Sequence, residues 1–265
     1  RVDGLHTGAR YGHNDAMSKH PAVARFAANT TGRDFVCGDI HGGWYLLERA
    51  LSEVAFDPDR DRLFCVGDLI DRGDDSARFP EFLAQPWFHA IIGNHEQLAL
   101  RAVLEGDRDA QAVWWMNGGA WIMDLQPREG RDLVAQLADL PLALEIEGYG
   151  DDPVVLAHAG VPGTDWPGVR SWLEEAGDSR VTGEPMHTLF WDRSQIRRAD
   201  EAAITGARHV FHGHTVLEQV VTLGNRTYMD LGSVMTDRFA LIEIGPWLDA
   251  AAEAGSGLCI VEGAA

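Results

Sequence analysis

Three short motifs in the first half of the chain place residues that can bind metal ions directly after apolar segments. Each motif begins with a glycine that follows a hydrophobic run, and the next residue is Asp39, Asp68 or Asn94. About one strand–helix–strand unit separates each motif from the next. The carboxyl ends of neighbouring strands converge on one crevice in a wound α/β sheet, so we expect these side chains to lie side by side. Histidines accompany the first and third motifs, as His41 and His95.

Two later apolar segments also end in histidine, at His158 and His214. Carboxylate, amide and imidazole ligands together suit borderline divalent ions such as Mn²⁺, Fe²⁺ or Zn²⁺. Six ligands that share one carboxylate suggest a pair of ions, which lower the pKa of bound water to about 7. The predicted ligands are Asp39, His41, Asp68, Asn94, His158 and His214.

Apolar runs and helical patterns predict the elements that carry these motifs. Residues 35–37, 63–66 and 89–92 are short apolar runs, and residues 44–54 show apolar side chains at helical spacing. Continuous apolar strands that alternate with helices indicate a sheet covered on both faces.

The second half of the chain predicts shorter strands joined by turns. Residues 142–146 and 154–157 are expected to form two strands, and Gly224 and Asn225 the turn of a hairpin. We therefore expect βαβ units followed by a largely antiparallel sheet. The predicted fold class is α/β with mixed α+β character, in which two facing mixed β-sheets are flanked by helices.

The composition excludes several classes of protein. The chain has 265 residues, with 22 basic and 41 acidic side chains and a formal net charge of −19. This charge argues against nucleic-acid partners and against docking on anionic membranes, both of which need basic surfaces. No apolar run is long enough to cross a bilayer, and we expect no secretory signal. The sparse cysteines, Cys37, Cys65 and Cys259, indicate reduced thiols, so we expect a cytoplasmic protein.

The order and spacing of the motifs resemble those of the metal-dependent serine/threonine phosphoprotein phosphatases. The resemblance is closest to the branch that contains the protein phosphatase of bacteriophage lambda and its bacterial relatives. It extends from about Asp34 to Ile244 and includes the non-catalytic stretches 86–88, 115–121 and 139–142.

The resemblance implies a calcineurin-like metallophosphoesterase fold and a division of the chain. Residues 33–245 would form the catalytic domain, residues 1–32 an N-terminal arm and residues 246–265 a C-terminal extension.

The resemblance also divides the predicted ligands between the two ions. Asp39 and His41 would bind the first metal, and Asp68 would bridge both. The ligands of the second metal would be Asn94, His158 and His214. Manganese is the expected metal, with iron or zinc as other possibilities.

Four further residues acquire roles from the same resemblance. Arg72 and Arg193, together with Asn94, would bind the substrate phosphate, where guanidinium groups pair well with phosphate oxygens. His95 would be the general acid that protonates the leaving group, and Asp71 would orient it.

The implied activity is that of a phosphomonoesterase, in which a hydroxide that bridges the two metal ions attacks the phosphate ester in line. The expected substrates are phosphoproteins or phosphopeptides carrying phosphoserine or phosphothreonine, with phosphotyrosine and small aryl phosphates as further ones. The sequence does not indicate an oligomeric state.

Three alternatives remain open. Dinucleoside polyphosphate hydrolases share much of this scaffold, although they typically lack an acidic residue at the place of Asp71. A metallophosphodiesterase, including a nuclease, is the second. A non-enzymatic module that binds phosphoproteins is the third, and the presence of every expected ligand and of the acid argues against it.

Several residues near these motifs are not expected to take part directly in the chemistry. His212 is expected to lie beside the ligands or at the surface and not to bind metal. Trp114, Trp115 and Trp121 fall at helix-like offsets, which favours core packing. Glu96 is expected to favour the N-terminus of a helix.

Overall fold

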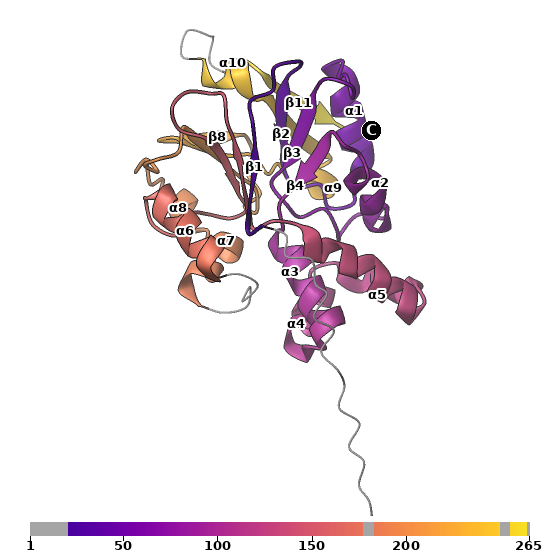
Figure 1. Ribbon diagram of the computed structural model, residues 1–265. Helices are drawn as coiled ribbons and strands as arrows, with labels where there is room; N and C mark the ends of the chain where they lie inside the picture. Colours follow the sequence, from indigo (N-terminus) through magenta and orange to yellow (C-terminus); the bar gives the residue numbers. More distant parts are fainter. Residues whose placement is uncertain (1–20, 177–182, 250–254, 264–265) are drawn as a thin grey trace, which may run out of the picture.

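Two facing β-sheets form the centre of the computed structural model, which describes residues 21–176, 183–249 and 255–263 (Figure 1). The five-stranded sheet consists, in spatial order, of β11 (Leu258–Glu262), β10 (Arg238–Glu243), β2 (Asp34–Cys37), β3 (Arg62–Cys65) and β4 (Phe88–Ala90). The six-stranded sheet consists of β1 (Val23–Phe26), β5 (Ala143–Ile146), β6 (Val154–Ala157), β7 (His209–His212), β9 (Arg226–Tyr228) and β8 (Val221–Leu223).

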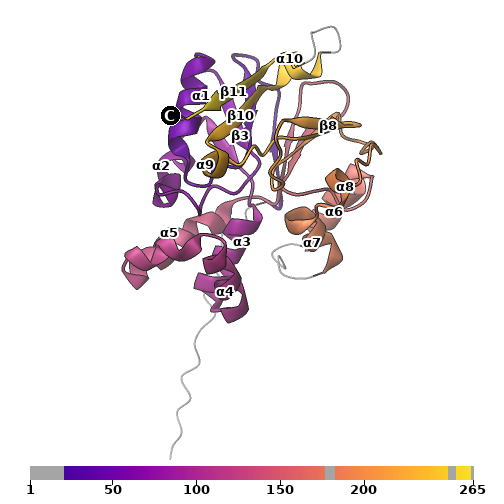
Figure 2. The ribbon, with the colours of Figure 1, turned by 180° about the vertical axis from the view of Figure 1, so that it is seen from behind.

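Helices flank the two sheets on their outer sides, as Figures 1 and 2 show. Beside the five-stranded sheet lie α1 (Trp44–Glu53), η1 (Ser76–Arg78) and α2 (Phe79–Leu83). Beside the six-stranded sheet lie α6 (Trp166–Ala176), α7 (Glu184–Trp191) and α8 (Ser194–Arg197). Two short helices near the end of the chain are α9 (Ser233–Thr236) and α10 (Ile244–Leu248). This arrangement confirms the predicted fold class.

A helical segment, residues 94–139, projects from one end of the sheets (Figure 1). It consists of α3 (Asn94–Leu100), η2 (Arg101–Glu105), α4 (Arg108–Met116), η3 (Gly119–Asp124), α5 (Pro127–Ala135) and η4 (Gln136–Asp139). In the part of the chain that the structure describes, no helix combines the length and the apolar character that crossing a membrane would require.

The core between the sheets explains why the first strands are continuously apolar. Val36 of β2 and Phe64 of β3 belong to one buried cluster with residues of the other sheet, among them Leu144, Leu156 and Phe211. The alternate residues of the same strands join a second buried cluster with α1. Each fully buried side chain of this size contributes about 1.5–3 kcal/mol, so both faces hold the strands in place.

The expectation of a largely antiparallel second sheet is wrong. Strands β6, β7 and β9 run parallel to one another, and so do β1 and β5. The chain between β6 and β7 carries α6, α7 and α8, and such a long crossover brings a strand back in the same direction. The antiparallel pairs are β5 with β6 and the predicted hairpin of β8 and β9 around Gly224 and Asn225.

The sheets also extend beyond the expected domain boundaries at residues 33 and 245. Strand β1 pairs with β5, and β11 pairs with β10, so segments assigned to the terminal arm and extension supply edge strands of the same sheets. The Val-Ala-Arg-Phe sequence of β1 lacks the continuous apolar run of a central strand, which explains why the sequence did not reveal it. Strand β11 does contain an apolar run, from Leu258 to Val261, and the sequence interpretation missed it. Residues 1–20 of the predicted arm lie outside the described residues.

Candidate metal centre

The Asp68 carboxylate lies at the centre of the predicted ligands. Its Oδ2 atom is 3.4 Å from Nε2 of His158, 3.6 Å from Nε2 of His41 and 3.9 Å from Nε2 of His95. All four side chains are buried, although they come from the ends of different strands. The ends of β2, β3 and β4 meet at one edge of the five-stranded sheet, as the motifs predict, and the end of β6 reaches them from the facing sheet.

Two groups of potential metal ligands share this carboxylate. One group is His41, Asp68 and His95, and the other is Asp68, His158 and His214. Within each group the ligand atoms lie within 4.8 Å of one another. Two compact groups with a common carboxylate have the donor set of a binuclear site for borderline divalent ions.

The two remaining predicted ligands border the same groups. Asn94 Oδ1 lies 3.0 Å from Nε2 of His158 and 2.9 Å from Nδ1 of His214. Asp39 accepts a hydrogen bond from the backbone N–H of His214 through Oδ2, at 2.9 Å. The structure therefore brings all six predicted ligands together.

Buried polar atoms that lack a hydrogen-bond partner test whether metal ions fit here. Among the described residues these atoms include Asp39 Oδ1, His214 Nε2 and Oδ2 of Asp230. Leaving a buried polar atom unpaired costs about 1–3 kcal/mol, so such atoms call for a partner that the protein does not provide. Divalent cations would serve all three atoms, and the residues present fit them.

The carboxylates of the cluster point to the same conclusion. Burial, the charge of Asp230 and the charge of Asp68 together raise the pKa of Asp39 well above its ordinary value. Burial also raises the pKa of Asp230. Several buried carboxylates can be ionised together only when cations lie among them.

Burial favours the neutral, metal-binding form of the imidazole ring at His41 and His214. It lowers the pKa of His41 well below its ordinary value and that of His214 to about 3. At His158 burial acts in the same direction, but the charge of Asp68 raises the pKa above its ordinary value. Nδ1 of His41 donates to the Ile70 carbonyl, and Nδ1 of His158 donates to the Val66 carbonyl, each at 2.8 Å. These hydrogen bonds fix the tautomer and direct the lone pair of Nε2 into the site.

The loops that carry the site are backbone-strained. Of the nine non-glycine residues with positive φ in the described parts of the chain, five are predicted site residues: His41, Asp68, Asp71, Arg72 and His214. Such conformations cost of order 1–3 kcal/mol each and persist only where the surroundings enforce them.

Glu96 enforces the conformation of the Asp68 loop. Its Oε2 accepts the backbone N–H groups of Asp68 and Gly93, and its Oε1 accepts those of Leu69 and Ile70, at 2.8–3.2 Å. Burial and the charge of Asp68 raise the pKa of Glu96 to about 7. Glu96 does lie in the first turn of α3, as the sequence predicts, and it also holds the metal-binding loop.

Replacing Glu96 by alanine is expected to lower the free energy of unfolding by about 3 kcal/mol, because four buried N–H donors lose their acceptor. Denaturant unfolding measures this change. The matched control is Glu48→Ala at an exposed helical site, with an effect within about 0.5 kcal/mol. Equal effects of the two substitutions would contradict the clamping role of Glu96.

A buried pair of side chains lies next to the ligands. Nδ1 of His95 is 2.6 Å from Oδ2 of Asp71, and both residues are at most 1% exposed. Burial by itself would lower the pKa of His95, but the charge of Asp68 and the hydrogen bond to Asp71 raise it above its ordinary value. The contact with Asp71 fixes the orientation of the His95 ring, and the raised pKa favours its protonated form.

The two arginines predicted to bind phosphate are exposed and lie beside the buried cluster. Nη1 of Arg72 lies 2.7 Å from Nε2 of His41, and Nη2 lies 3.2 Å from Nε2 of His95. Arg193 donates to the backbone carbonyl of His214 at 3.3 Å. Since Nε2 of His41 is the atom directed into the site, metal binding there requires the Arg72 guanidinium to move.

Four other residues near the site can be compared with the roles that the sequence predicted for them. His212 belongs to neither ligand group, and its Nδ1 donates to the Ala157 carbonyl at 2.6 Å. Trp115 is 42% exposed, so the expectation of core packing is wrong for it. Trp114 is fully buried, as expected, but both it and Trp121 contact Asp71 through their indole N–H groups.

Asp230 is a site residue that the sequence interpretation missed. It is 1% exposed, lies close enough to Asp39 for their charges to interact, and accepts the backbone N–H of Gly232 at 2.7 Å. Asp230 follows β9 in the same way that Asp39 and Asp68 follow β2 and β3. Its position directly after a strand could therefore have identified it as a candidate ligand.

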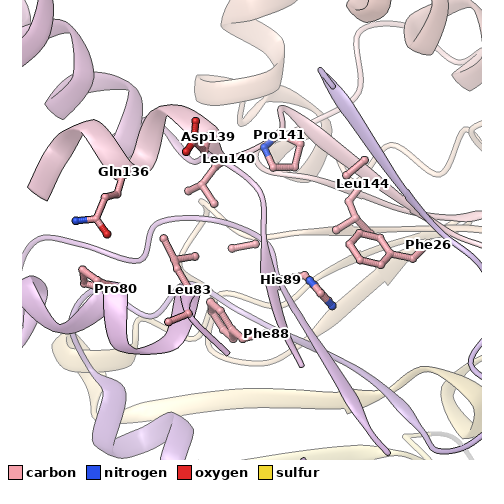
Figure 3. Close-up of a pocket in the computed structure, with 13 residues that line it drawn as sticks. Phe26, Pro80, Leu83, Phe88, His89, Gln136, Asp139, Leu140, Pro141 and Leu144 are labelled. Atoms are coloured by element: carbon pink, nitrogen blue, oxygen red, sulfur yellow. The ribbon is translucent and has the colours of Figure 1, made fainter. Parts of the chain in front are cut away.

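A surface cavity of about 400 Å³ lies apart from this cluster, beside β1, β4, α2 and η4 (Figure 3). Its lining is largely apolar and includes Phe26, Leu83, Phe88 and Leu140, with His89 as a polar member. None of the predicted site residues lines it. The buried ligand cluster, and not this cavity, therefore has the chemistry of a reaction centre.

Comparison with known proteins identifies the family. The model of the calcineurin-like phosphoesterase family matches residues 35–218. Serine/threonine-protein phosphatase 2 of Escherichia coli K12 is 32% identical over 216 residues, covering 79% of this chain and 92% of the relative. Serine/threonine-protein phosphatase 1 of Salmonella typhimurium LT2 is 33% identical over 231 residues, covering 86% and 99%. The chain belongs to the calcineurin-like phosphoesterase family, as the resemblance predicted.

Two further similarities are weaker: one covers less than half of each chain, and the other has a low sequence identity. A symmetrical bis(5'-nucleosyl)-tetraphosphatase of Shewanella sp. MR-4 is 32% identical over 133 residues, which covers 48% of this chain and 44% of the relative. A solved structure of a protein serine/threonine phosphatase from Saccharomyces cerevisiae has a TM-score of 0.66 at 18% identity, covering 93% and 85% of the two chains. The latter confirms the metallophosphoesterase fold.

Proposed function

We propose that this protein is a two-metal phosphomonoesterase that dephosphorylates phosphoserine and phosphothreonine in proteins. The observation that carries the proposal is the pair of ligand groups that share Asp68, one of which includes His95 of the buried His95–Asp71 pair. Similarity to serine/threonine-protein phosphatases over nearly their whole length supports a phosphoprotein substrate.

The six clustered residues would hold two divalent ions. Asp39 and His41 would bind the first ion, and Asp68 would bind both. The second ion would have the ligands Asn94, His158 and His214. Bound ions supply positive charge for the phosphate and bring the pKa of water near 7. The mixed oxygen and nitrogen donors suit manganese, and also iron or zinc.

The arginines and the amide would bind the phosphate. Arg72 and Arg193 are exposed at the mouth of the cluster, where a dianionic phosphate would enter. A guanidinium binds phosphate oxygens more strongly than imidazole nitrogens, so substrate binding would draw Arg72 away from His41 and His95. The side chain of Asn94 lies at the border of the second ligand group and would contact the same phosphate.

His95 would give its proton to the leaving alkoxide. Because Nδ1 donates to Asp71, the proton available for transfer is the one on Nε2, which faces the cluster. Asp71 stabilises the charged imidazole and keeps its ring in one orientation. General acid catalysis of this kind typically contributes 10²–10⁴-fold.

Hydrolysis of dinucleoside polyphosphates is a second candidate, favoured by the partial similarity to symmetrical tetraphosphatases. A substrate panel separates the candidates. With Mn²⁺ present, we expect kcat/KM for a phosphoserine peptide to exceed the values for diadenosine tetraphosphate and for bis(p-nitrophenyl) phosphate. Higher values for either of the latter would replace the proposed substrate class by a dinucleotide or a phosphodiester.

A further inference from the structure

Two indole groups hold the carboxylate that partners the proposed general acid. Nε1 of Trp114 donates to Oδ2 of Asp71 at 2.8 Å, and Nε1 of Trp121 donates to Oδ1 at 2.7 Å. Nδ1 of His95 also contacts Oδ2, at 2.6 Å. Each oxygen of this fully buried carboxylate therefore has a hydrogen-bond donor, and rotation of the carboxylate would break at least one bond.

The indoles come from the helical segment 94–139, outside both sheets. Trp114 is in the last turns of α4 and Trp121 is in η3, and the turn between them passes through Gly118. Gly118 has φ of 105°, and a Cβ atom built there would lie 2.6 Å from the backbone nitrogen of Arg72. The turn between α4 and η3 therefore packs closely against the Asp71–Arg72 turn, in which both residues have positive φ.

The chemistry of the donors matters because the indoles are neutral. His95 is the only ion-pair partner of Asp71 within the described residues. The buried carboxylate of Glu145 is different, since it pairs with Arg25 and Arg170 in addition to the indole of Trp166. Neutral N–H donors satisfy the Asp71 oxygens without adding a cation that would compete with the imidazolium of His95.

We propose that Trp114 and Trp121 are positioning residues of the reaction, which act by holding the Asp71 carboxylate in the orientation that aligns His95. This inference rests on the proposed function, because it concerns the same proton transfer. It assigns the helical segment a role in catalysis: the segment supplies the rigid support that catalytic constellations need in order to stay aligned.

Conservative substitutions that remove only the N–H donors test the inference. In Trp114→Phe and Trp121→Phe we expect kcat for a phosphoserine peptide to fall about tenfold each, since a hydrogen bond to a charged group is lost. The kcat for p-nitrophenyl phosphate, whose leaving group needs little protonation, should change less than about twofold. KM and bound metal should stay unchanged. The control Trp166→Phe removes an indole bond to a buried carboxylate elsewhere and should leave the ratio of the two kcat values unchanged.

A double substitution separates positioning from general stability. In an Asp71→Asn background, Trp121→Phe should cause no further loss on the phosphoserine peptide, because the oriented carboxylate is already gone. An equal loss in both backgrounds, or an equal loss on both substrates, would overturn the inference. If Asp71→Asn itself slowed both substrates equally, the proposed acid, and not the indoles, would be refuted.

A spectroscopic measurement on the full chain does not depend on activity or on the stability of the tryptophan variants. Asp71→Asn should shift the indole N–H resonances of Trp114 and Trp121 in ¹⁵N-correlated spectra and leave that of Trp166 in place. Unshifted Trp114 and Trp121 resonances would overturn the inference.

Discussion

Replacing Asp68 by asparagine is expected to remove both metal ions and nearly all hydrolytic activity. Oδ2 of Asp68 lies within 3.9 Å of three histidine nitrogens and belongs to both ligand groups, so one substitution weakens both sites. Loss of outer-shell partners alone costs 10–100-fold in metal affinity, and loss of a shared ligand should cost more than about 100-fold. Metal content after desalting and kcat/KM with added Mn²⁺ measure the effect.

The matched control is Asp34→Asn, which also alters a buried, ion-paired aspartate. Asp34 is in β2, pairs with Arg62 at 2.7 Å and contacts none of the predicted ligands. This variant should lose stability but retain its metal. An Asp68→Asn protein that binds two ions and turns over near the wild-type rate would show that Asp68 does not bridge them.

Replacing His95 by asparagine is expected to slow poor leaving groups by about 10²–10⁴-fold, because no proton then reaches the departing alkoxide. Hydrolysis of p-nitrophenyl phosphate should fall much less, since its leaving group is stable as an anion. Bound metal should not change. Rates for an alkyl and an aryl phosphate, together with metal analysis, measure these effects.

The metal analysis matters because Nε2 of His95 is also near Asp68 and His41. Loss of one ion in His95→Asn would make His95 a ligand and not the acid, and equal slowing of both substrates would also contradict the acid role. His209→Asn is the control, since His209 is buried and bonded to Thr227 away from the cluster.

The sequence predicted those parts of the fold whose signal is local. Strands β2 and β3 could be recognised because both of their faces are buried, which requires an unbroken apolar run. Strand β1 could not, because its alternating exposure leaves only a weak pattern and its partner β5 is more than 100 residues away. The direction of β7 depends on the helical crossover between β6 and β7, and no short segment of the sequence predicts the geometry of that crossover.

The site residues also include some that the sequence could predict and some that it could not. Asp39, Asp68 and Asn94 were predictable because the ends of parallel strands converge on one edge of a sheet. Trp114 and Trp121 were not, because helical spacing shows which residues share a face but not that an indole N–H reaches a carboxylate 43 or 50 residues earlier in the chain. Glu96 was placed correctly on α3, while its four backbone contacts depend on how the Asp68 loop folds over it.

Anomalous diffraction from crystals grown with Mn²⁺ would show directly whether the cluster binds two metal ions. We expect two peaks about 3.5–4 Å apart, one on each side of the Asp68 carboxylate. One peak should contact Asp39 and His41, and the other should contact Asn94, His158 and His214. A single peak, or none within this cluster, would contradict a binuclear centre.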